Sequence, residues 1–256
     1  MPSLPLFDLT GRRAFITGSS RGIGLAYAYA VAEAGAEVVL NARSADDVAK
    51  AVEAMRAAGH AASGYAFDVA DPAAVEDNIA RIEAEAGPID ILFNNAGIQR
   101  RTPLEEFPIE TWREVMTINL DAVFYVGQAV AKRMIPRRRG KIINTCSLGS
   151  EIARATISPY VTSKGAVKML TKAMCVEWAK YNIQANGIGP GYIRTELNTA
   201  LSTNPEFNAF IERRTPAGRW GEVDELKGAA IFLAAPASDF VNGQILYVDG
   251  GVLSAM

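Results

Sequence analysis

Four polar residues in the middle of the chain have the types and spacing of an acid–base site. Ser147 is followed by Tyr160 and then by Lys164, and Asn119 lies upstream. Tyr160 and Lys164 are four residues apart, so a helix would place them on one face, a turn apart. An ammonium group there favours the phenolate and lowers the pKa of the tyrosine from its usual value near ~10. The pattern predicts that Tyr160 exchanges protons near neutral pH, with the Ser147 hydroxyl facing a substrate oxygen.

A glycine-rich segment near the N-terminus could bind the phosphates of a dinucleotide. Its glycines follow the spacing G-x-x-x-G-x-G, a variant of the dinucleotide fingerprint. The segment lies between a predicted strand and a predicted helix, whose N–H groups and positive dipole end attract phosphate. The residues expected to contact the cofactor here are Gly18, Ser20, Arg21, Gly22, Ile23 and Gly24.

The end of the second predicted strand distinguishes NADP from NAD. An acidic residue there would hold the ribose hydroxyls, but residues 40–44 contain no carboxylate, and the first is Asp46. Arg43 can instead pair with a 2′-phosphate, with Arg21 and Ser44 nearby. The alternative is that Arg43 is an ordinary solvated arginine. The sequence therefore favours NADP(H) over NAD(H).

Two more strand ends are expected to border the cofactor. After the fourth strand, the small residues Ala96 and Gly97 indicate close backbone approach to a ligand, although Asn94 and Asn95 could equally lock the turn. These ends are Asp68-Val69 after the third strand and Asn95-Ala96-Gly97 after the fourth.

Composition excludes several classes of protein. The chain has 256 residues, of which 49% are hydrophobic and 21% charged, as in globular proteins. A net charge of −2 argues against nucleic-acid binding. We find no secretory signal and no apolar run long enough for a membrane span. Two cysteines are too few for a disulfide framework or a zinc site, so we expect a cytoplasmic protein without a metal; Cys146 is interpreted as buried filler.

Short apolar runs alternate with longer amphipathic ones, which predicts one doubly wound parallel sheet in a single domain, residues 1–256. Asp71-Pro72 and Ser158-Pro159 have the pattern of helix entries with a capping residue. Residues 192–220 are too long for a simple connection and are expected to form a substrate lid. The arginine run 137–139 is interpreted as a solvated turn. Strands are expected at residues 13–17, 37–40, 64–67, 89–93, 141–145, 183–188 and 244–248, and helices at 22–34, 45–58, 72–86, 110–134, 160–180 and 223–233, with weak helices at 196–201 and 205–213.

Taken together, these motifs resemble the short-chain dehydrogenase/reductase family over essentially the whole chain. The matching positions are Thr17 to Gly24, Asn94 to Gly97, Asn119, Ser147, Tyr160, Lys164, Pro190-Gly191 and Tyr247 to Gly251. The resemblance implies seven parallel strands, a homotetramer, Tyr160 as acid/base and Ser147 orienting the substrate oxygen. It also implies that Lys164 binds the nicotinamide ribose and that Asn119 holds a water. The carboxamide end of the cofactor would meet Pro190, Gly191, Ile193 and Thr195.

Within that family, the chain is most similar to the gluconate 5-dehydrogenase branch, which implies oxidation of D-gluconate to 5-keto-D-gluconate. The similarity rests on residues 97–101, 147–158, 184–192, 205–207, 213–216 and 219–221. One bidentate arginine could hold the carboxylate of such a small-molecule substrate, although Arg100 and Arg101 could also be a solvated pair. The residues expected to border the cleft are Arg101, Glu151, Arg154 and Asn198. The alternatives are a 3-oxoacyl-carrier-protein reductase, another polyol or ketose reductase, and a non-catalytic dinucleotide sensor.

Overall fold

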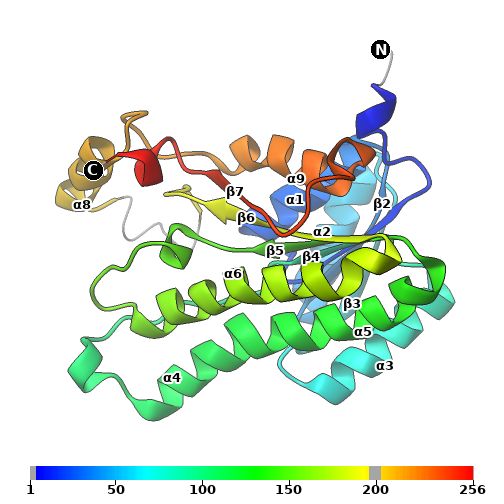
Figure 1. The fold of residues 1–256 in the computed structure, drawn as a ribbon, viewed down its shortest axis with the longest axis horizontal. Helices are drawn as coiled ribbons and strands as arrows, with labels where there is room; N and C mark the ends of the chain where they lie inside the picture. The colour runs from blue at the N-terminus through cyan, green and yellow to red at the C-terminus, as the bar shows by residue number, and fades with distance from the viewer. Residues whose placement is uncertain (1–3, 196–202, 256) are drawn as a thin grey trace.

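The computed structural model describes residues 4–195 and 203–255, and within them the predicted parallel sheet is confirmed (Figure 1). Seven strands pair in the order β3-β2-β1-β4-β5-β6-β7, all parallel. The order reverses between β1 and β4, the point where doubly wound sheets bind ligands at their carboxyl ends. The strands are β1 (Arg13–Ile16), β2 (Glu37–Ala42), β3 (Ala62–Ala66), β4 (Ile91–Asn94), β5 (Gly140–Thr145), β6 (Ile183–Pro190) and β7 (Ile245–Val248).

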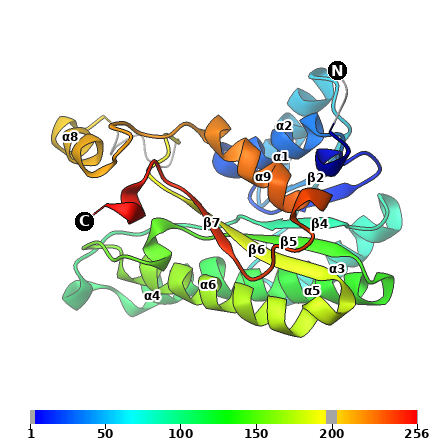
Figure 2. The same ribbon diagram turned by 45° about the horizontal axis from the view of Figure 1, so that its top comes forward.

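Helices cover both faces of the sheet, as Figure 2 shows. One face carries α1 (Gly22–Glu33), α2 (Ala45–Ala57) and α9 (Lys227–Ala234). The other carries α3 (Pro72–Glu85), α4 (Ile109–Met116), α5 (Ala122–Arg137) and α6 (Ser158–Trp178). The remaining helix, α8 (Pro205–Arg214), lies beyond the sheet near the C-terminus. No helix in the described ranges is both long enough and apolar enough to cross a bilayer.

Successive residues of each central strand face opposite sides of the sheet, so each strand contributes to two cores. Phe15 packs in the core under α3 and α5, whereas its neighbours Ala14 and Ile16 pack in the core under α1 and α9. In β4, Leu92 likewise packs in the core under α3 and α5, whereas its neighbours Ile91 and Phe93 pack in the core under α1 and α9. This two-sided burial explains why the strands are nearly continuous apolar runs.

One predicted helix entry is confirmed and the other is wrong. Asp71 caps α3, because its Oδ1 accepts hydrogen bonds from the N–H groups of Ala73 and Ala74 at 2.9 and 3.2 Å. Ser158 does not cap α6. The helix begins at Ser158 itself, with Ile157 in the capping position, and the Ser158 hydroxyl is buried without a hydrogen-bond partner.

The helix predicted over residues 110–134 is interrupted by a wider turn. Between α4 and α5, residues Thr117–Asp121 form a π-helical segment that contains the buried residue Asn119. Wide turns of this kind occur frequently at functional sites.

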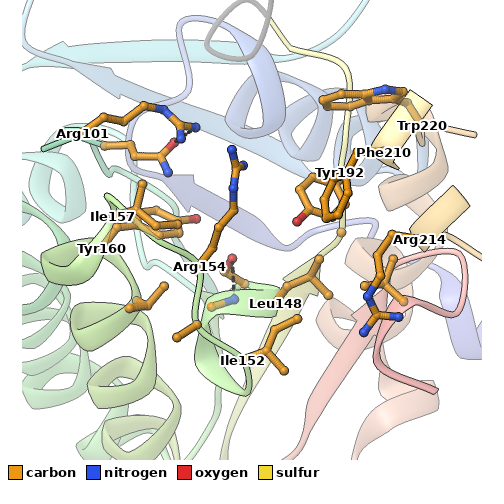
Figure 3. Close-up of a pocket in the computed structure, with 17 residues that line it drawn as sticks. Arg101, Leu148, Ile152, Arg154, Ile157, Tyr160, Tyr192, Phe210, Arg214 and Trp220 are labelled. Atoms are coloured by element: carbon orange, nitrogen blue, oxygen red, sulfur yellow. Dashed lines mark hydrogen bonds between the residues drawn. The ribbon is translucent and has the colours of Figure 1, made fainter. Parts of the chain in front are cut away.

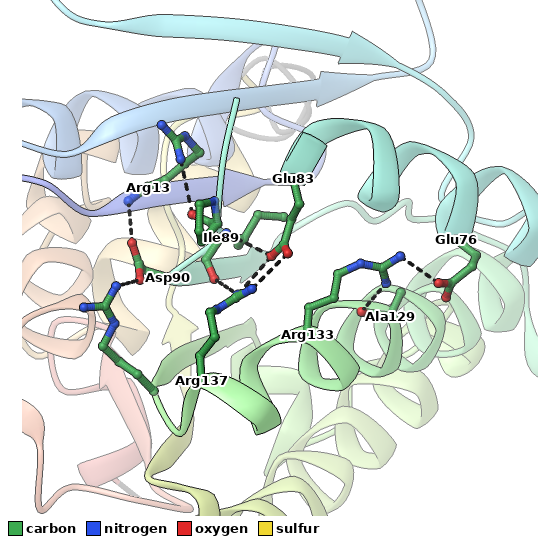
Figure 4. Close-up of polar contacts among 10 residues, drawn as sticks. Arg13, Glu76, Glu83, Ile89, Asp90, Ala129, Arg133 and Arg137 are labelled. Atoms are coloured by element: carbon green, nitrogen blue, oxygen red, sulfur yellow. Dashed lines mark hydrogen bonds and ion pairs between the residues drawn. The ribbon is translucent and has the colours of Figure 1, made fainter. Parts of the chain in front are cut away.

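The arginine run 137–139 is a solvated turn only in part, because Arg138 and Arg139 are exposed while Arg137 is half-buried in ion pairs. Arg137 makes two 2.9 Å hydrogen bonds to the carboxylate of Glu83 and donates to the carbonyl of Ile89 at 2.9 Å (Figure 4). Arg139 pairs with Asp90, a buried carboxylate that also accepts the N–H of Arg13. These contacts join the end of α5 to the segments that enter β1 and β4, so the run is structural.

Candidate active site

The glycine-rich turn after β1 has the backbone geometry that only glycine adopts without strain. Gly18 has a φ of +61° and Gly22 a φ of +57°. A Cβ on Gly24 would lie 2.3 Å from the carbonyl oxygen of Gly18, so α1 can start here only with glycine. The Asn95 amide donates to the carbonyls of Thr17 and Gly18 at 3.1 and 3.0 Å. Asn95 therefore locks the turn, the alternative that the sequence left open for it.

The turn opens onto a long groove at the carboxyl ends of β1, β2 and β4. Two cavities, of about 310 and 520 Å³, share five lining residues and so form one continuous space. A Cβ on Gly22 would meet nothing within 4 Å, so the N-terminus of α1 faces open space. The predicted cofactor residues that line the groove are Gly18, Ser20, Arg21, Gly22, Ile23, Gly24, Arg43, Ser44, Asp68, Val69, Asn95, Ala96, Gly97, Tyr160, Lys164 and Thr195.

Arg43 and Ser44 line the part of the groove that Tyr160 does not border. The Ser44 hydroxyl caps α2 by accepting the N–H of Asp47 at 3.2 Å, which fixes the start of the helix beside Arg43. The sequence analysis missed Asp47 as a groove residue. Ser44 and Asp47 have the three-residue spacing of a helix cap, and this spacing could have indicated that Asp47 lies beside Ser44 at the groove.

A third cavity, of about 350 Å³, adjoins the groove (Figure 3). Ser147 lies two residues past the end of β5, as predicted, and lines this cavity together with Tyr160. Among the described residues, Tyr160 alone lines both this cavity and the groove. Its phenol therefore stands at the junction where two ligands would meet.

The pKa of Tyr160 is raised and not lowered, contrary to the prediction from its spacing with Lys164. The Lys164 ammonium lies 5.8 Å from the centre of the Tyr160 ring and donates to the carbonyl of Thr145 at 2.6 Å. Burial raises the pKa of Tyr160, opposed by a hydrogen bond from Ser147, and Lys164 is not among the causes. Burial also lowers the pKa of Lys164 to about 8, which makes it a poorer partner for a phenolate.

The side chain of Asn119 holds the site together instead of facing a ligand. Its Oδ1 accepts the N–H of Ile98 at 2.8 Å, and its Nδ2 donates to the carbonyl of Ile98 at 2.9 Å and to the Ser163 hydroxyl at 3.3 Å. Ser163 lies on α6 between Tyr160 and Lys164. Asn119 thus fixes the loop after β4 against the helix that carries the predicted acid–base pair.

Three arginines line the substrate-side cavity, and no ion pair with a carboxylate forms at any of them within the described part of the chain. They are Arg101 and Arg154, both predicted, and Arg214, which was missed. Arg100 instead pairs with Glu114 at 2.8 Å, so Arg101 is the member of that pair that faces the cavity. Burial and then the charge of Arg154 lower the pKa of Arg101. Among the described residues, the cavity lining contains no acidic side chain and is strongly cationic.

Glu151 does not line this cavity, and its predicted role in substrate binding is wrong. Its Oε1 pairs with the Lys168 ammonium and accepts the Tyr247 hydroxyl at 2.6 Å, and both contacts lower the pKa of Glu151. These contacts use the carboxylate to join the loop after β5 to α6 and β7. Asn198 lies outside the described residues.

The residues predicted near the carboxamide end are divided among several places. Gly191 lines the substrate-side cavity and Thr195 lines the groove. Pro190 is buried at the end of β6 and lines none of these spaces, and Ile193 faces a smaller cavity of about 70 Å³ behind them.

An aromatic wall closes the cavity opposite α6, and the sequence analysis did not identify it. The rings of Tyr192 and Trp220 are 5.9 Å apart, and Phe207 lies 6.1 Å from Trp220. The Arg154 guanidinium stacks over Phe207 at 4.3 Å, which connects α8 to the loop after β5. The number of aromatic residues in the segment 192–220 could have indicated such a wall. Their spacing in the sequence does not reveal which rings are in contact.

Fold and site together define a dinucleotide-dependent oxidoreductase of the Rossmann type, with a tyrosine between the nucleotide groove and the substrate cavity. The chain belongs to the short-chain dehydrogenase/reductase family. A family model described as Enoyl-(Acyl carrier protein) reductase matches residues 18–253.

Two curated relatives are similar over almost their full length. Gluconate 5-dehydrogenase of Gluconobacter oxydans (strain 621H) is 56% identical over 247 residues, covering 96% of each chain. The 5-keto-D-gluconate 5-reductase of Escherichia coli (strain K12) is 49% identical over 251 residues, covering 98% of this chain and 99% of the relative.

Solved structures have the same fold. The crystal structure of a gluconate 5-dehydrogenase from Burkholderia cenocepacia J2315 in complex with NADP and tartrate superposes with a TM-score of 0.97. It is 58% identical and covers 99% of both chains. A short-chain type dehydrogenase/reductase from Mycobacterium marinum superposes with a TM-score of 0.93 at 39% identity, covering 97% of this chain and 98% of the other.

Proposed function

We propose that this protein is an NADP-linked oxidoreductase that interconverts a secondary alcohol and a ketone on a sugar acid, D-gluconate and 5-keto-D-gluconate. The position of Tyr160 between the nucleotide groove and a cationic cavity carries the proposal. The names of the two curated relatives, which are enzymes of gluconate and 5-keto-D-gluconate, support it.

The groove has the features of a dinucleotide site. The N–H groups at the start of α1, freed by the glycine turn, would hold the pyrophosphate, and Lys164 would reach the nicotinamide ribose. NADP, when bound, accepts or donates the hydride. The NADP in the neighbouring structure from Burkholderia cenocepacia supports the phosphorylated cofactor, and Arg43 would hold its 2′-phosphate.

The chain's own residues would move the proton that accompanies hydride transfer. In ketone reduction the phenol of Tyr160, whose protonated form burial favours, gives its proton to the substrate oxygen as the carbon accepts hydride, and alcohol oxidation uses the reverse transfer to the phenolate. Ser147 would donate to the same substrate oxygen, because its Oγ already accepts the Gly149 N–H at 3.1 Å and its hydrogen can point outward. Arg101 and Arg154 would hold the carboxylate of the sugar acid.

Loss of the Arg43 guanidinium should change the choice of cofactor. We expect Arg43→Ala to raise the KM for NADP+ about 10- to 100-fold, the cost of a charge-assisted hydrogen-bond pair, and to leave the KM for NAD+ within about threefold. Initial rates with both cofactors test this. The control is Lys50→Ala, which removes one exposed positive charge from α2 outside the groove. An equal loss for both cofactors would contradict a 2′-phosphate contact.

A substrate panel separates the proposed function from its rivals. NADPH oxidation is followed by absorbance with 5-keto-D-gluconate, with the neutral ketose D-fructose and with an acetoacetyl thioester. We expect turnover of the keto acid, and kcat/KM for the ketose at least about tenfold lower because it lacks the group that the arginines hold. Turnover of the thioester alone would favour a 3-oxoacyl-carrier-protein reductase. A protein that binds NADPH and turns over nothing would be a dinucleotide sensor.

We also infer a cytoplasmic homotetramer in which each chain is one domain with a substrate lid at residues 192–220. Exposed apolar side chains on α5 and α6, those of Phe124, Met169 and Val176, support burial against other subunits. Both cysteines are unpaired, which agrees with a reducing compartment. The ring contacts that join α8 to Tyr192 and Trp220 support a lid that moves as a unit.

A further inference from the structure

The substrate-side cavity has more positive charge than one sugar-acid carboxylate requires. Three guanidinium groups line about 350 Å³, and no Asp or Glu is among the described lining residues. Several arginines elsewhere on the surface do have acidic partners, as Arg100 has in Glu114 and Arg219 in Glu225. Like charges gathered in a partly buried space are unfavourable unless anions bind between them.

Figure 3 shows the three guanidinium groups spread across the cavity, with Arg154 between Arg101 and Arg214. Arg101 and Arg154 are close enough for the charge of one to lower the pKa of the other. Arg214 stands across the cavity from Tyr160 and Arg101, with its guanidinium beside the C-terminal segment (Figure 3). A single carboxylate held by Arg101 and Arg154 leaves the charge of Arg214 uncompensated.

Arg214 is oriented for a ligand and not merely solvated. It is half-buried in α8, and its Nη1 donates to the carbonyl of Ala255 at 3.0 Å, which fixes the plane of the guanidinium. Four further N–H donors of a guanidinium remain beyond this bond. The neighbouring cavity lining is apolar, from Ile152, Phe210 and Val252, and such surroundings strengthen a charge-assisted contact.

We propose that Arg214 is a second carboxylate subsite, and that the cavity binds open-chain polyhydroxy diacids with one carboxylate at each end. This inference rests on the proposed function, because it uses the same cavity and places the first carboxylate on Arg101 and Arg154. A hydroxyl of the diacid that reaches Tyr160 would be oxidised as in the monoacid, with hydride passing to the bound NADP+ and the hydroxyl proton to the phenolate.

D-Glucarate and D-gluconate are matched probes, because they differ only in whether C6 is a carboxylate or an alcohol. Titration calorimetry on the NADPH-loaded protein measures both affinities without turnover, because the reduced cofactor cannot accept hydride from either acid. We expect the wild-type protein to bind D-glucarate at least about tenfold more tightly than D-gluconate, the value of one additional charge-assisted contact. Equal or weaker binding of the diacid would overturn the proposal.

Substitution of Arg214 tests the subsite directly. We expect Arg214→Gln to reduce affinity for D-glucarate at least about tenfold more than affinity for D-gluconate, and Arg214→Lys to restore part of the difference. Arg213→Gln is the matched control, because it removes an exposed guanidinium from the next position of α8. An equal loss for both acids in Arg214→Gln would show that Arg214 merely supports the wall or holds the only carboxylate.

The same measurements separate failure of this inference from failure of the proposed function. If D-gluconate is oxidised but D-glucarate binds no more tightly, only the second subsite is wrong. If neither D-gluconate nor 5-keto-D-gluconate is turned over while D-glucarate binds through Arg214, the subsite stands and the monoacid is the wrong substrate.

Discussion

Replacing Tyr160 with phenylalanine should lower kcat/KM by about 10²- to 10⁴-fold and leave the affinity for NADP(H) within about threefold. The substitution removes one oxygen from a ring that lines both the groove and the substrate cavity, so the shape of each is kept. No other described side chain has a titratable proton at that junction. The proton of the substrate hydroxyl therefore loses its acceptor, whereas the nucleotide keeps its glycine turn and Lys164.

Rates are measured in both directions with the best substrate of the panel, and cofactor affinity is measured by titration of NADPH fluorescence. Tyr181→Phe is the control, because Tyr181 lies after α6 and lines none of the cavities. The pH profile gives a second readout, since the ionisation that limits wild-type turnover should disappear in Tyr160→Phe. A variant that retains a tenth or more of the activity would remove Tyr160 from the proton transfer.

The sequence predicts most of the fold because the sheet imposes a pattern that local residues must obey. Strands buried on both faces are mostly apolar, and in β1 the consecutive residues Ala14, Phe15 and Ile16 are all buried because they face alternate cores. The glycine turn is equally readable, since a Cβ at Gly24 would overlap the Gly18 carbonyl. The placement of Tyr160 and Lys164 on one helix could also be predicted from their spacing alone.

The errors concern contacts between residues distant in sequence. Whether Glu151 faces the cavity depends on Lys168 and Tyr247, and neither is visible from the loop that carries Glu151. Arg137 looks solvated until Glu83 of another helix is placed beside it. Arg214 was overlooked because only the folded chain brings the end of α8 and the C-terminal segment to the cavity. Spacing predicts which residues share an element, but not which element lies opposite.

The error about Lys164 concerns energy more than position. The ammonium is on the predicted face, but burial opposes its charge, and its hydrogen bond goes to the Thr145 carbonyl. Within the described residues, no carboxylate pairs with Lys164 to offset that cost. We infer that the charge of Lys164 is kept for the nucleotide that the groove binds, and that the folded protein is less stable for it.

Replacing Lys164 with methionine should therefore stabilise the cofactor-free protein while it removes activity. Methionine is unbranched like lysine, one heavy atom shorter, and has no charge to bury. Burial lowers the pKa of Lys164 from 10.5 to about 8, so the unfolded chain holds the proton more tightly than the folded one. At about 1.4 kcal/mol for each pKa unit, the cost removed at pH 7 is at most about 3 kcal/mol, less the lost bond to Thr145.

The pH dependence gives the sign of this effect. Between pH 8 and 10.5 the unfolded wild-type chain binds more protons at this position, so wild-type stability contributed by Lys164 rises with pH across that window. Below pH 8 the full cost is present in the wild type. The stability advantage of Lys164→Met should accordingly be largest at pH 7 and shrink towards pH 10, because other groups titrate alike in both proteins.

Urea denaturation of the cofactor-free proteins at pH 7, 8, 9 and 10, followed by tryptophan fluorescence, measures the difference. Lys172→Met is the matched control, since it removes an exposed lysine from the same helix and should leave the pH dependence unchanged. Addition of NADP+ should reverse the order of stability, because only the wild-type ammonium can contact the nucleotide. A Lys164→Met protein that is less stable than the wild type at pH 7, or whose advantage grows with pH, would show that the buried ammonium is compensated in the folded chain.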